Sequence, residues 1–534
     1  MSEPVVRIRD LTIALPKGAD RPHAVEGLNL DLESGKILCV VGESGSGKSM
    51  SAYALTGLLP RALKPTAGSI LFEGRDLLTL DESAWRRLRG RRIAMVFQEP
   101  MTALNPVMRI GDQIAEMFEA HNLLTRAERQ AKAVALATEV GLPNPAEAVR
   151  AYPHQLSGGQ RQRAMIAMAL ALEPSVLVAD EPTTALDVTT QAQILRLIRD
   201  LQRERGMSVL FITHDFGVVA EIADHVAVLQ RGRLVESGPA DSVLRDPQAP
   251  YTRALLAAVP SLTPPPRPPL GEAPVALSVR GLAKTYSTKG RLFGKPRVVA
   301  AVQDVTFDVR RGETLGLVGE SGSGKSTTAR LAIRLIEPDG GTVRLGALDY
   351  TALGKAALRD KRSRIQMIFQ DPFASLNPRR TVEQIITAGP IAHGVPAAEA
   401  RARARNLLDL VGLDPKAAAR YPNAFSGGQR QRIGIARALA MEPDVLVADE
   451  AVSALDVSVQ RQVLDLLEDL KQRLSLAMLF ITHDLRVAAT ICDRIAVMHR
   501  GAVVEIRGTA ELFAAPEHAY TRSLLAAVPG AGVA

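Results

Sequence analysis

Two copies of one eight-residue motif carry the residue types that bind phosphate groups. The motif reads GESGSGKS at residues 42–49 and again at residues 319–326, and it fits the pattern G-x-x-x-x-G-K-[ST]. Its glycines let backbone N–H groups surround phosphate oxygens, and a helix that starts at the lysine adds partial positive charge. The lysine of each copy is predicted to reach the β- and γ-phosphates of a nucleotide, and the serine to bind Mg²⁺. These residues are Lys48, Ser49, Lys325 and Ser326.

Other polar patterns recur in both halves of the chain. The sequence SGGQ, at residues 157–160 and 426–429, precedes a helical pattern, so its N–H groups are expected to face an anion. A pair Asp-Glu ends an apolar run in each half, and a histidine follows a later apolar run at an identical distance of 33 residues from that glutamate. This repetition favours a γ-phosphate contact over a purely structural histidine. The residues are Asp180, Glu181, His214, Asp449, Glu450 and His483.

The apolar run before each motif predicts a buried strand that positions it. Such runs precede the phosphate loops, the Asp-Glu pairs and the histidines, and ligands bind at the carboxyl ends of strands in doubly wound sheets. The runs are Ile37–Val41, Val176–Ala179, Val209–Thr213, Thr314–Val318, Val445–Ala448 and Met478–Thr482. Alternating strands are expected near the start of each half, as in Val6 and Ile8.

The repeats divide the 534-residue chain into two domains, at residues 1–262 and 275–534. Residues 263–274, TPPPRPPLGEAP, contain six prolines and join the two domains. At roughly 3.1 Å per residue, extended polyproline geometry would span on the order of 35–40 Å. We therefore expect a semi-stiff linker here and no binding site.

Composition and cysteine usage exclude several classes of protein. The net charge of +8 is spread along the chain, which indicates either a generally basic surface or a peripheral protein near anionic lipid or nucleic acid. Cys39 and Cys492 are the only cysteines, and Cys39 is expected in the core, so a disulfide framework, a zinc site and an iron–sulfur cluster are excluded. Without a signal peptide or an apolar run of membrane-spanning length, we expect a cytoplasmic protein.

The ordered motifs resemble those of the ATP-binding cassette (ABC) ATPases over essentially all of both halves. The set comprises the phosphate loop, a strand-ending glutamine, the signature LSGGQ or FSGGQ, the Asp-Glu pair, an ALD loop and the histidine. The resemblance implies an α/β fold with two P-loop nucleotide-binding domains in tandem. Each domain would contain a RecA-like α/β core, a β-rich edge subdomain and an α-helical subdomain. The helical subdomains are expected at about residues 99–156 and 371–425.

The resemblance also implies roles for the site residues. The catalytic residues would be a general-base glutamate, a histidine and a glutamine in each half, namely Glu181, His214, Gln98, Glu450, His483 and Gln370. The metal ligands would be Ser49, Gln98, Asp180, Ser326, Gln370 and Asp449. The ATP-binding residues would be Gly42, Glu43, Ser44, Gly45, Ser46, Gly47, Lys48, Ser49, Ser157, Gly158, Gly159, Gln160, Asp187, Tyr286, Gly319, Glu320, Ser321, Gly322, Ser323, Gly324, Lys325, Ser326, Ser426, Gly427, Gly428, Gln429 and Asp456.

In that family the two cassettes pack head to tail, which implies two composite ATP sites. One would join Lys48 to Ser426 and the other Lys325 to Ser157. Two features depart from the family pattern. Tyr286 fits the position of the aromatic residue that stacks on adenine, but Leu15 occupies this position in the first half. Pro182-Thr183 becomes Ala451-Val452 in the second half, where the base Glu450 is retained.

Two further motifs resemble the oligopeptide, dipeptide and nickel importer ATPases, including fused forms such as glutathione importers. They are EPMTALNP and DPFASLNP after the glutamines, and APYTRALLAAVP and HAYTRSLLAAVP at the end of each half. The resemblance implies a peripheral ATPase on the cytoplasmic face of the inner membrane. Its partners would be two membrane permeases and an extracytoplasmic binding protein, with no nucleic acid. Translation factors and DNA-repair ATPases fit less well, because the linker is short and zinc cysteines are lacking. Dipeptide, longer peptide, glutathione, nickel chelate and opine all remain open as substrates.

Overall fold

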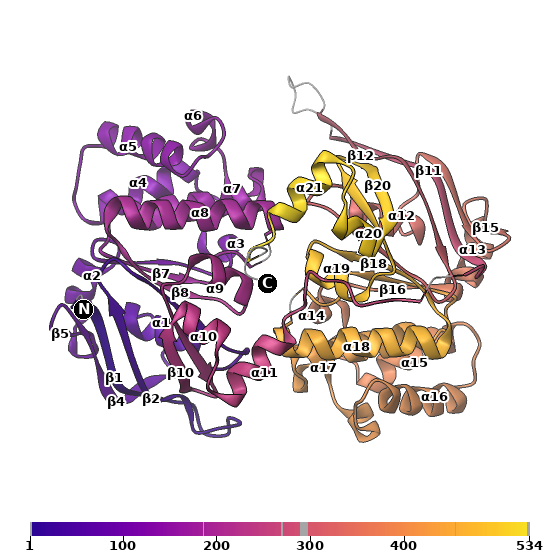
Figure 1. Ribbon diagram of the computed structural model, residues 1–534, viewed down its shortest axis with the longest axis horizontal. Coiled ribbons are helices and arrows are strands. Elements are labelled where there is room, and N and C mark those ends of the chain that lie inside the picture. The colour runs from indigo at the N-terminus through magenta and orange to yellow at the C-terminus, as the bar shows by residue number, and fades with distance from the viewer. Residues whose placement is uncertain (1–2, 185, 269–270, 289–296, 454, 531–534) are drawn as a thin grey trace. The chain divides into compact units, whose positions relative to one another are not determined.

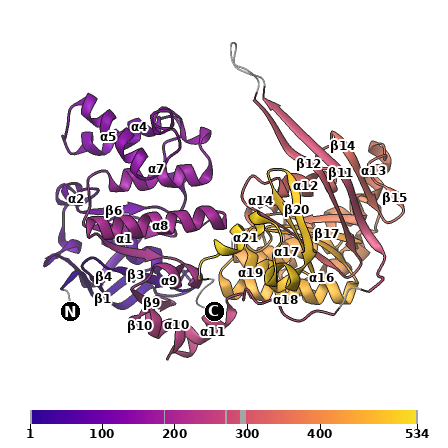
Figure 2. The ribbon, with the colours of Figure 1, turned by 45° about the horizontal axis from the view of Figure 1, so that its top comes forward.

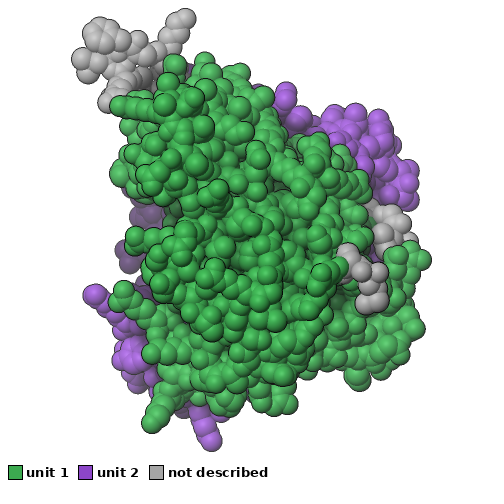
Figure 3. Space-filling view, turned by 90° about the vertical axis from the view of Figure 1, so that its left-hand side faces the viewer, with its two compact units in different colours: residues 1–259, 528–534 green, residues 260–527 purple. Residues whose placement is uncertain are grey.

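The chain forms two compact units, one of Met1–Val259 with Val528–Ala534 and the other of Pro260–Ala527 (Figure 1, Figure 3). The computed structural model describes residues 3–184, 186–268, 271–288, 297–453 and 455–530. We call these the first unit and the second unit. Each contains one copy of every repeated motif.

A six-stranded sheet forms the centre of the first unit, in the order β10-β9-β3-β8-β7-β6. All neighbours pair in parallel except β10, which is antiparallel to β9. The strands β3, β7 and β8 are buried along their whole length, as expected for a parallel sheet covered on both faces. The bounds are β3 (Ile37–Val41), β6 (Ile93–Val96), β7 (Val176–Asp180), β8 (Ser208–Ile212), β9 (His225–Gln230) and β10 (Arg233–Pro239).

A smaller sheet and a group of helices flank this core. The antiparallel sheet has the order β2-β1-β4-β5 and contains β1 (Pro4–Ala14), β2 (His23–Glu33), β4 (Lys64–Phe72) and β5 (Arg75–Asp76). In Figure 1 and Figure 2, α4, α5 and α7 lie at the opposite end of the first unit from β1 and β4. The helices are α1 (Lys48–Thr56), α2 (Glu82–Leu88), α3 (Pro100–Ala103), α4 (Ile110–Ala120), α5 (Arg126–Glu139), α6 (Pro145–Ala148), α7 (Gly158–Leu170), α8 (Val188–Arg205), α9 (Phe216–Ile222), α10 (Ala240–Arg245) and α11 (Pro250–Ala258).

The second unit repeats both sheets with the same strand order, β20-β19-β13-β18-β17-β16 and β12-β11-β14-β15. Its strands are β11 (Val275–Thr288), β12 (Arg297–Arg310), β13 (Thr314–Val318), β14 (Gly340–Leu345), β15 (Leu348–Asp349), β16 (Ile365–Ile368), β17 (Val445–Asp449), β18 (Ala477–Thr482), β19 (Arg494–His499) and β20 (Ala502–Gly508). Its helices are α12 (Lys325–Ala332), α13 (Lys355–Lys361), α14 (Pro372–Ser375), α15 (Val382–Ala392), α16 (Ala397–Leu410), α17 (Gly427–Leu439), α18 (Val457–Leu474), α19 (Leu485–Ile491), α20 (Thr509–Ala514) and α21 (Ala519–Ala526).

The predicted α/β core with a β-rich subdomain and a helical subdomain is confirmed in both units. The apolar runs before the phosphate loops are β3 and β13 with the predicted bounds. Asp180 and Asp449 are the last residues of β7 and β17, one residue further into the strand than the apolar pattern indicates. Cys39 is fully buried in β3, as expected.

The described part of the proline-rich segment is anchored to the second unit through Arg267. Its guanidinium donates to Asp493 at 2.9 Å, to Glu468 at 3.4 Å and to the carbonyl of Thr490 at 2.5 Å. Lys471, whose side chain is only 4% exposed, completes the cluster with contacts to Glu468 and Asp493. Asp493 also accepts the N–H of Thr314, the first residue of β13. The segment is therefore part of the packed second unit at this point.

In the first unit a different cation lies beside the equivalent aspartate. Asp224 occupies the position of Asp493 and accepts the N–H of Ile37 at 2.8 Å. The nearby cation there is Arg199 of α8, 4.0 Å from Asp224. Glu468 stands at the Arg199 position in the second unit, where Arg267 of the proline-rich segment and Lys471 of α18 supply the cations instead.

Replacing Arg267 with alanine should destabilise the second unit, because it leaves the carboxylates of Asp493 and Glu468 with Lys471 alone. We expect a loss of about 1–3 kcal/mol in the free energy of unfolding, measured by chemical denaturation. Arg461→Ala removes an exposed pair with Asp465 on α18 and should cost less than about 1 kcal/mol. Equal small losses in both variants would contradict a structural role for Arg267.

Candidate nucleotide site

The phosphate loop of each unit joins a buried strand to a helix N-terminus. In the first unit the loop leaves β3 at Gly42, whose φ of 147° and position exclude any side chain. A Cβ atom on Gly42 would lie 2.2 Å from the carbonyl oxygen of Leu229. The equivalent Gly319 has a φ of 150°, and a Cβ atom there would lie 2.2 Å from the carbonyl oxygen of Met498. The glycine at this position therefore fixes the backbone path that the motif needs.

The lysines of the loops are buried and directed at backbone oxygens. Lys48 Nζ donates to the carbonyls of Gly42 at 2.7 Å and Glu43 at 2.9 Å. Lys325 Nζ makes the equivalent contacts at 2.7 and 2.8 Å. A buried ammonium requires such partners, and a phosphate group is a stronger one. This position fits the predicted role of both lysines at the β- and γ-phosphates.

A buried carboxylate faces the serine of each loop. Asp180 Oδ1 accepts from Ser49 Oγ at 3.0 Å, and Asp449 Oδ1 from Ser326 Oγ at 3.0 Å. Burial raises the pKa of both aspartates. Asp180 Oδ2 is buried and has no hydrogen-bond partner among the described residues. A hydroxyl beside an unpaired carboxylate oxygen is a set of oxygen donors that suits Mg²⁺.

The predicted base, glutamine and histidine meet at the end of β7. Glu181 Oε2 accepts from Gln98 Nε2 at 3.1 Å and from Thr184 Oγ1 at 2.9 Å, and it lies 3.3 Å from His214 Nδ1. Glu181 has a φ of 46°, and its N–H donates to the carbonyl of Ile212 in the neighbouring β8. The backbone thus turns the carboxylate toward the loop edge.

The second unit repeats this cluster at the end of β17. Glu450 has a φ of 48°, accepts from Gln370 Nε2 at 2.6 Å and lies 3.4 Å from His483 Nδ1. Ser453 takes the place of Thr184 and donates to the Glu450 carbonyl instead of the carboxylate. The change to Ala451-Val452 after the glutamate leaves this arrangement intact.

The charges of the cluster lower the pKa of the glutamate in both units and raise the pKa of the histidine in the second. Burial raises the pKa of Glu181, but the hydrogen bonds and charges of His214, Thr184 and Lys48 outweigh it and lower the pKa to about 2. Burial also raises the pKa of Glu450, but the hydrogen bond and charge of His483 outweigh it, so the pKa is lowered overall. Burial lowers the pKa of His483, but contact with Glu450 outweighs it and raises the pKa overall.

The serines of the signature motifs cap the helices α7 and α17. Ser157 Oγ accepts the N–H of Gln160, whose side chain accepts the N–H of Ser157, and Ser426 and Gln429 repeat this capping box. Gly159 packs against α8, because a Cβ there would lie 2.5 Å from Thr190 Cγ2. Within the described residues, the side-chain contacts of Ser157 and Ser426 are with their own helices.

The remaining predicted ATP-binding residues lie on other elements. Asp187 and Asp456 are the N-cap residues of α8 and α18. Tyr286 lies on β11 opposite Val299, is 40% exposed and has Lys284 Nζ 6.0 Å from its ring centre. Leu15 is half-buried against the core of the first unit.

Tyr520 is a site contact that the sequence reasoning missed. Its hydroxyl accepts the N–H of Glu320 in the second phosphate loop at 3.1 Å, and its ring stacks on His499 with centroids 4.0 Å apart. The repeated YTR of the terminal motifs was a signal, because Tyr251 stands at the same place in the first unit. The terminal region therefore contacts the second site directly.

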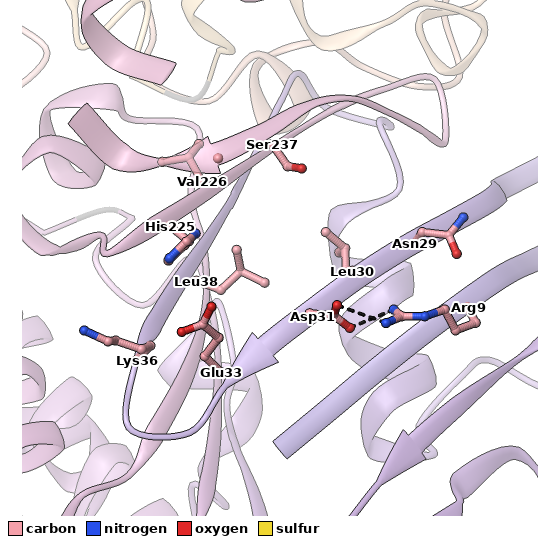
Figure 4. Close-up of a pocket in the computed structure, with 11 residues that line it drawn as sticks. Arg9, Asn29, Leu30, Asp31, Glu33, Lys36, Leu38, His225, Val226 and Ser237 are labelled. Atoms are coloured by element: carbon pink, nitrogen blue, oxygen red, sulfur yellow. Dashed lines mark hydrogen bonds and ion pairs between the residues drawn. The ribbon is translucent and has the colours of Figure 1, made fainter. Parts of the chain in front are cut away.

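The hollow drawn in Figure 4 lies apart from all predicted site residues. It has a volume of about 360 Å³ and is lined by parts of β1, β2, β9 and β10, with Arg9 held by both carboxylate oxygens of Asp31 at 2.7 and 3.0 Å. His225 and Lys36 also line it. We assign it no part in the nucleotide site.

Comparison with known proteins places both units in one family. The ABC transporter model matches residues 25–184 and 302–453, and the model of the oligopeptide/dipeptide transporter C-terminal region matches residues 235–283 and 504–533. Two ABC ATPase domains in tandem therefore define the class of the protein. The chain belongs to the ABC transporter family, within the group that carries the oligopeptide/dipeptide transporter C-terminal region, and it is an ATP-binding ABC transporter ATPase.

Named relatives are similar over nearly the whole chain. The glutathione import ATP-binding protein GsiA of Shigella dysenteriae is 48% identical, covering 98% of this chain and 89% of the relative. GsiA of Escherichia coli K12 is 47% identical over the same shares. A solved dimeric ATP-binding cassette with ADP and phosphate bound is 28% identical, with a TM-score of 0.40, covering 44% of this chain and 98% of its own.

Glu181→Gln should abolish most hydrolysis at the first phosphate loop while leaving ATP binding intact. The amide keeps the size of the side chain but loses the charge that attracts a water proton, so we expect kcat to fall by at least about 10²-fold. The measurement is phosphate release and ATP affinity in a Glu450→Gln background. Glu204→Gln, an exposed glutamate on α8, is the control and should leave both quantities unchanged.

The ion pair of His483 predicts how stability changes with pH. Because the folded-state pKa of His483 lies above its ordinary value of 6.5, the pair stabilises the second unit fully below pH 6.5. This contribution is lost as the pH rises through the raised pKa. The free energy of unfolding should therefore fall over that range in the wild type and fall less in His483→Gln. His393→Gln, at an exposed histidine, should keep the wild-type slope. Identical slopes in all three proteins would contradict the pair.

Proposed function

We propose that the chain is the ATP-hydrolysing subunit of an importer for peptides or related small solutes such as glutathione. The observation that carries this proposal is the similarity to glutathione import ATP-binding proteins, which extends over 98% of the chain and includes both terminal regions. Peptides and glutathione share peptide bonds and a terminal carboxylate, so one class of binding protein and permease suits both.

The chemistry at each loop is hydrolysis of the γ-phosphate bond of ATP. Glu181 and Glu450 act as general bases that accept a proton from the attacking water, a role that suits carboxylates ionised at neutral pH. Bound Mg²⁺ would neutralise charge that develops on the phosphates. Its protein ligands would be Ser49, Asp180 and Gln98 in the first unit and Ser326, Asp449 and Gln370 in the second. His214 and His483 stay fixed by their glutamates and contact the γ-phosphate.

Each ATP is completed by the signature of the other unit, Lys48 with Ser426 and Lys325 with Ser157. The capping serines support this pairing, because each lies at a helix N-terminus whose first N–H groups suit an anion from outside the unit. Two sites in one chain make closure intramolecular, which raises the effective concentration of the partner unit toward millimolar.

The region after each glutamine couples ATP hydrolysis to the membrane permeases. Beside Gln98 lies a hollow of about 510 Å³, lined by Tyr53, Phe97, Glu99, Thr102 and Ala103. Because Gln98 also contacts Glu181, a permease helix in this hollow would sense the state of the nucleotide. The partners are two membrane permeases and an extracytoplasmic binding protein, and the chain lies peripherally at the cytoplasmic face. In the described residues no helix is long and apolar enough to span a membrane.

Ser426→Arg tests the pairing of the two sites. In a Lys325→Ala background only the Lys48 site remains active, and the arginine should block entry of its phosphates, lowering ATP hydrolysis by at least about tenfold. Ser157→Arg in the same background is the matched control and should have a much smaller effect. If Ser426→Arg leaves hydrolysis unaltered, the pairing is wrong.

Reconstitution tests the transport function. The chain is combined in vesicles with the two permeases that it captures in a pull-down and with their binding protein. ATP hydrolysis should rise when glutathione or a short peptide is the solute, and the solute should accumulate only with active Glu181 and Glu450. Stimulation by ribosomes or DNA in place of permeases and solute would contradict the importer function.

A further inference from the structure

The turn between the first two strands differs between the units at the place where a nucleotide would lie. In the first unit Leu15 N–H donates to the carbonyl of Pro22 at 2.8 Å, so these two residues face each other. In the second unit Tyr286 faces Val299. Arg21, which precedes Pro22, therefore corresponds to Val298. Where the second unit has a tyrosine and a valine, the first unit has a leucine and an arginine.

The guanidinium of Arg21 lies at the first phosphate loop. Its Nη2 donates to the carbonyl of Gly45, and a Cβ atom on Gly45 would be 3.9 Å from this nitrogen. The Nε of Arg21 is buried and has no hydrogen-bond partner among the described residues. The equivalent Gly322 has nothing within 4 Å of its Cβ position in the part of the chain that the structure describes. The first loop thus carries a cation that the described second loop lacks.

An arginine in this place has the chemistry of a phosphate ligand. Its planar group presents several N–H donors, and charge-assisted bonds to phosphate are about twice as strong as bonds to a neutral carbonyl. Nε has no partner among the described residues and Nη2 donates only to a neutral carbonyl, so a charged acceptor would bind this group more strongly. A triphosphate bound to the loop is such an acceptor. The second unit instead exposes Tyr286, Val298 and Val299, at 40%, 62% and 45%. These side chains suit the flat face of a base.

We propose that Arg21 binds the triphosphate in the first site, so that the two sites hold the same nucleotide through different groups. Both loops bind the phosphates. In the first site Arg21 adds a further phosphate contact, and in the second site Tyr286 adds a contact with the nucleotide base. This inference rests on ATP binding and is independent of the transported solute. The first site is consequently more tolerant of the base than the second.

The test is calorimetric binding of ATP, GTP and inorganic triphosphate, each with Mg²⁺, to the full chain. A Lys325→Ala background reports the first site and a Lys48→Ala background reports the second. In the first background Arg21→Ala should weaken all three ligands by roughly tenfold, with an unchanged melting temperature. Val298→Ala in the second background is the matched control and should not weaken inorganic triphosphate. Tyr286→Ala there should weaken ATP but not inorganic triphosphate.

The outcomes distinguish failure of this proposal from failure of nucleotide binding at the first loop. Loss of ATP and GTP binding with unchanged inorganic triphosphate binding would make Arg21 a contact of the base or ribose and overturn the proposal. Unchanged affinity for all three ligands would also overturn it. Failure of the unsubstituted first site to bind any of them would instead refute nucleotide binding itself. An Arg21→Lys variant that binds inorganic triphosphate more tightly than Arg21→Ala, but less tightly than the chain with Arg21, supports direct phosphate contact.

Discussion

The arrangement of both sites depends on a buried glutamate held at the end of a central strand. Glu181 and Glu450 adopt left-handed backbone conformations, and each N–H is bonded to the neighbouring strand. A non-glycine residue in this conformation is costly and persists only where the surroundings impose it. Here the parallel sheet imposes it and presents the carboxylate to a histidine and a glutamine. Because the same sheet also ends at the phosphate loop, the strand order brings this carboxylate to the same edge of the sheet as the loop.

Both units hold the glutamate in the same way, and they differ in the residues around the site. The strand order, the buried lysines and the aspartate–serine contacts are duplicated almost atom for atom. The differences lie in residues around this edge. Arg21 stands against Val298, Tyr53 of α1 acts on Asp180 where Arg330 of α12 acts on Asp449, and Arg267 replaces Arg199 of α8. Duplication therefore preserved the residues at this edge of the sheet, while the residues around it diverged.

The sequence was sufficient for the parts of the site that are local in the chain. The phosphate loops, the strand-end Asp-Glu pairs and the histidines could be placed because each follows an apolar run within a few residues. Arg21 and Tyr520 could not be placed, because each reaches its loop through a fold that joins distant positions. The anchoring of Arg267 was hidden by its proline neighbours, which indicate a free spacer, while Glu468 and Asp493 are about 200 residues away.

We propose that one chain closes on two ATP molecules, each bound by the phosphate loop of one unit and the signature of the other. The most direct measurement is the number of ATP molecules retained by the Glu181→Gln/Glu450→Gln chain after removal of free nucleotide, together with its mass in solution. We expect two retained ATP molecules per chain, no change in mass on binding ATP, and loss of both ATP molecules when Ser157 and Ser426 are replaced by arginine. Retention of both ATP molecules after those replacements, or a doubling of mass on binding ATP, would contradict it.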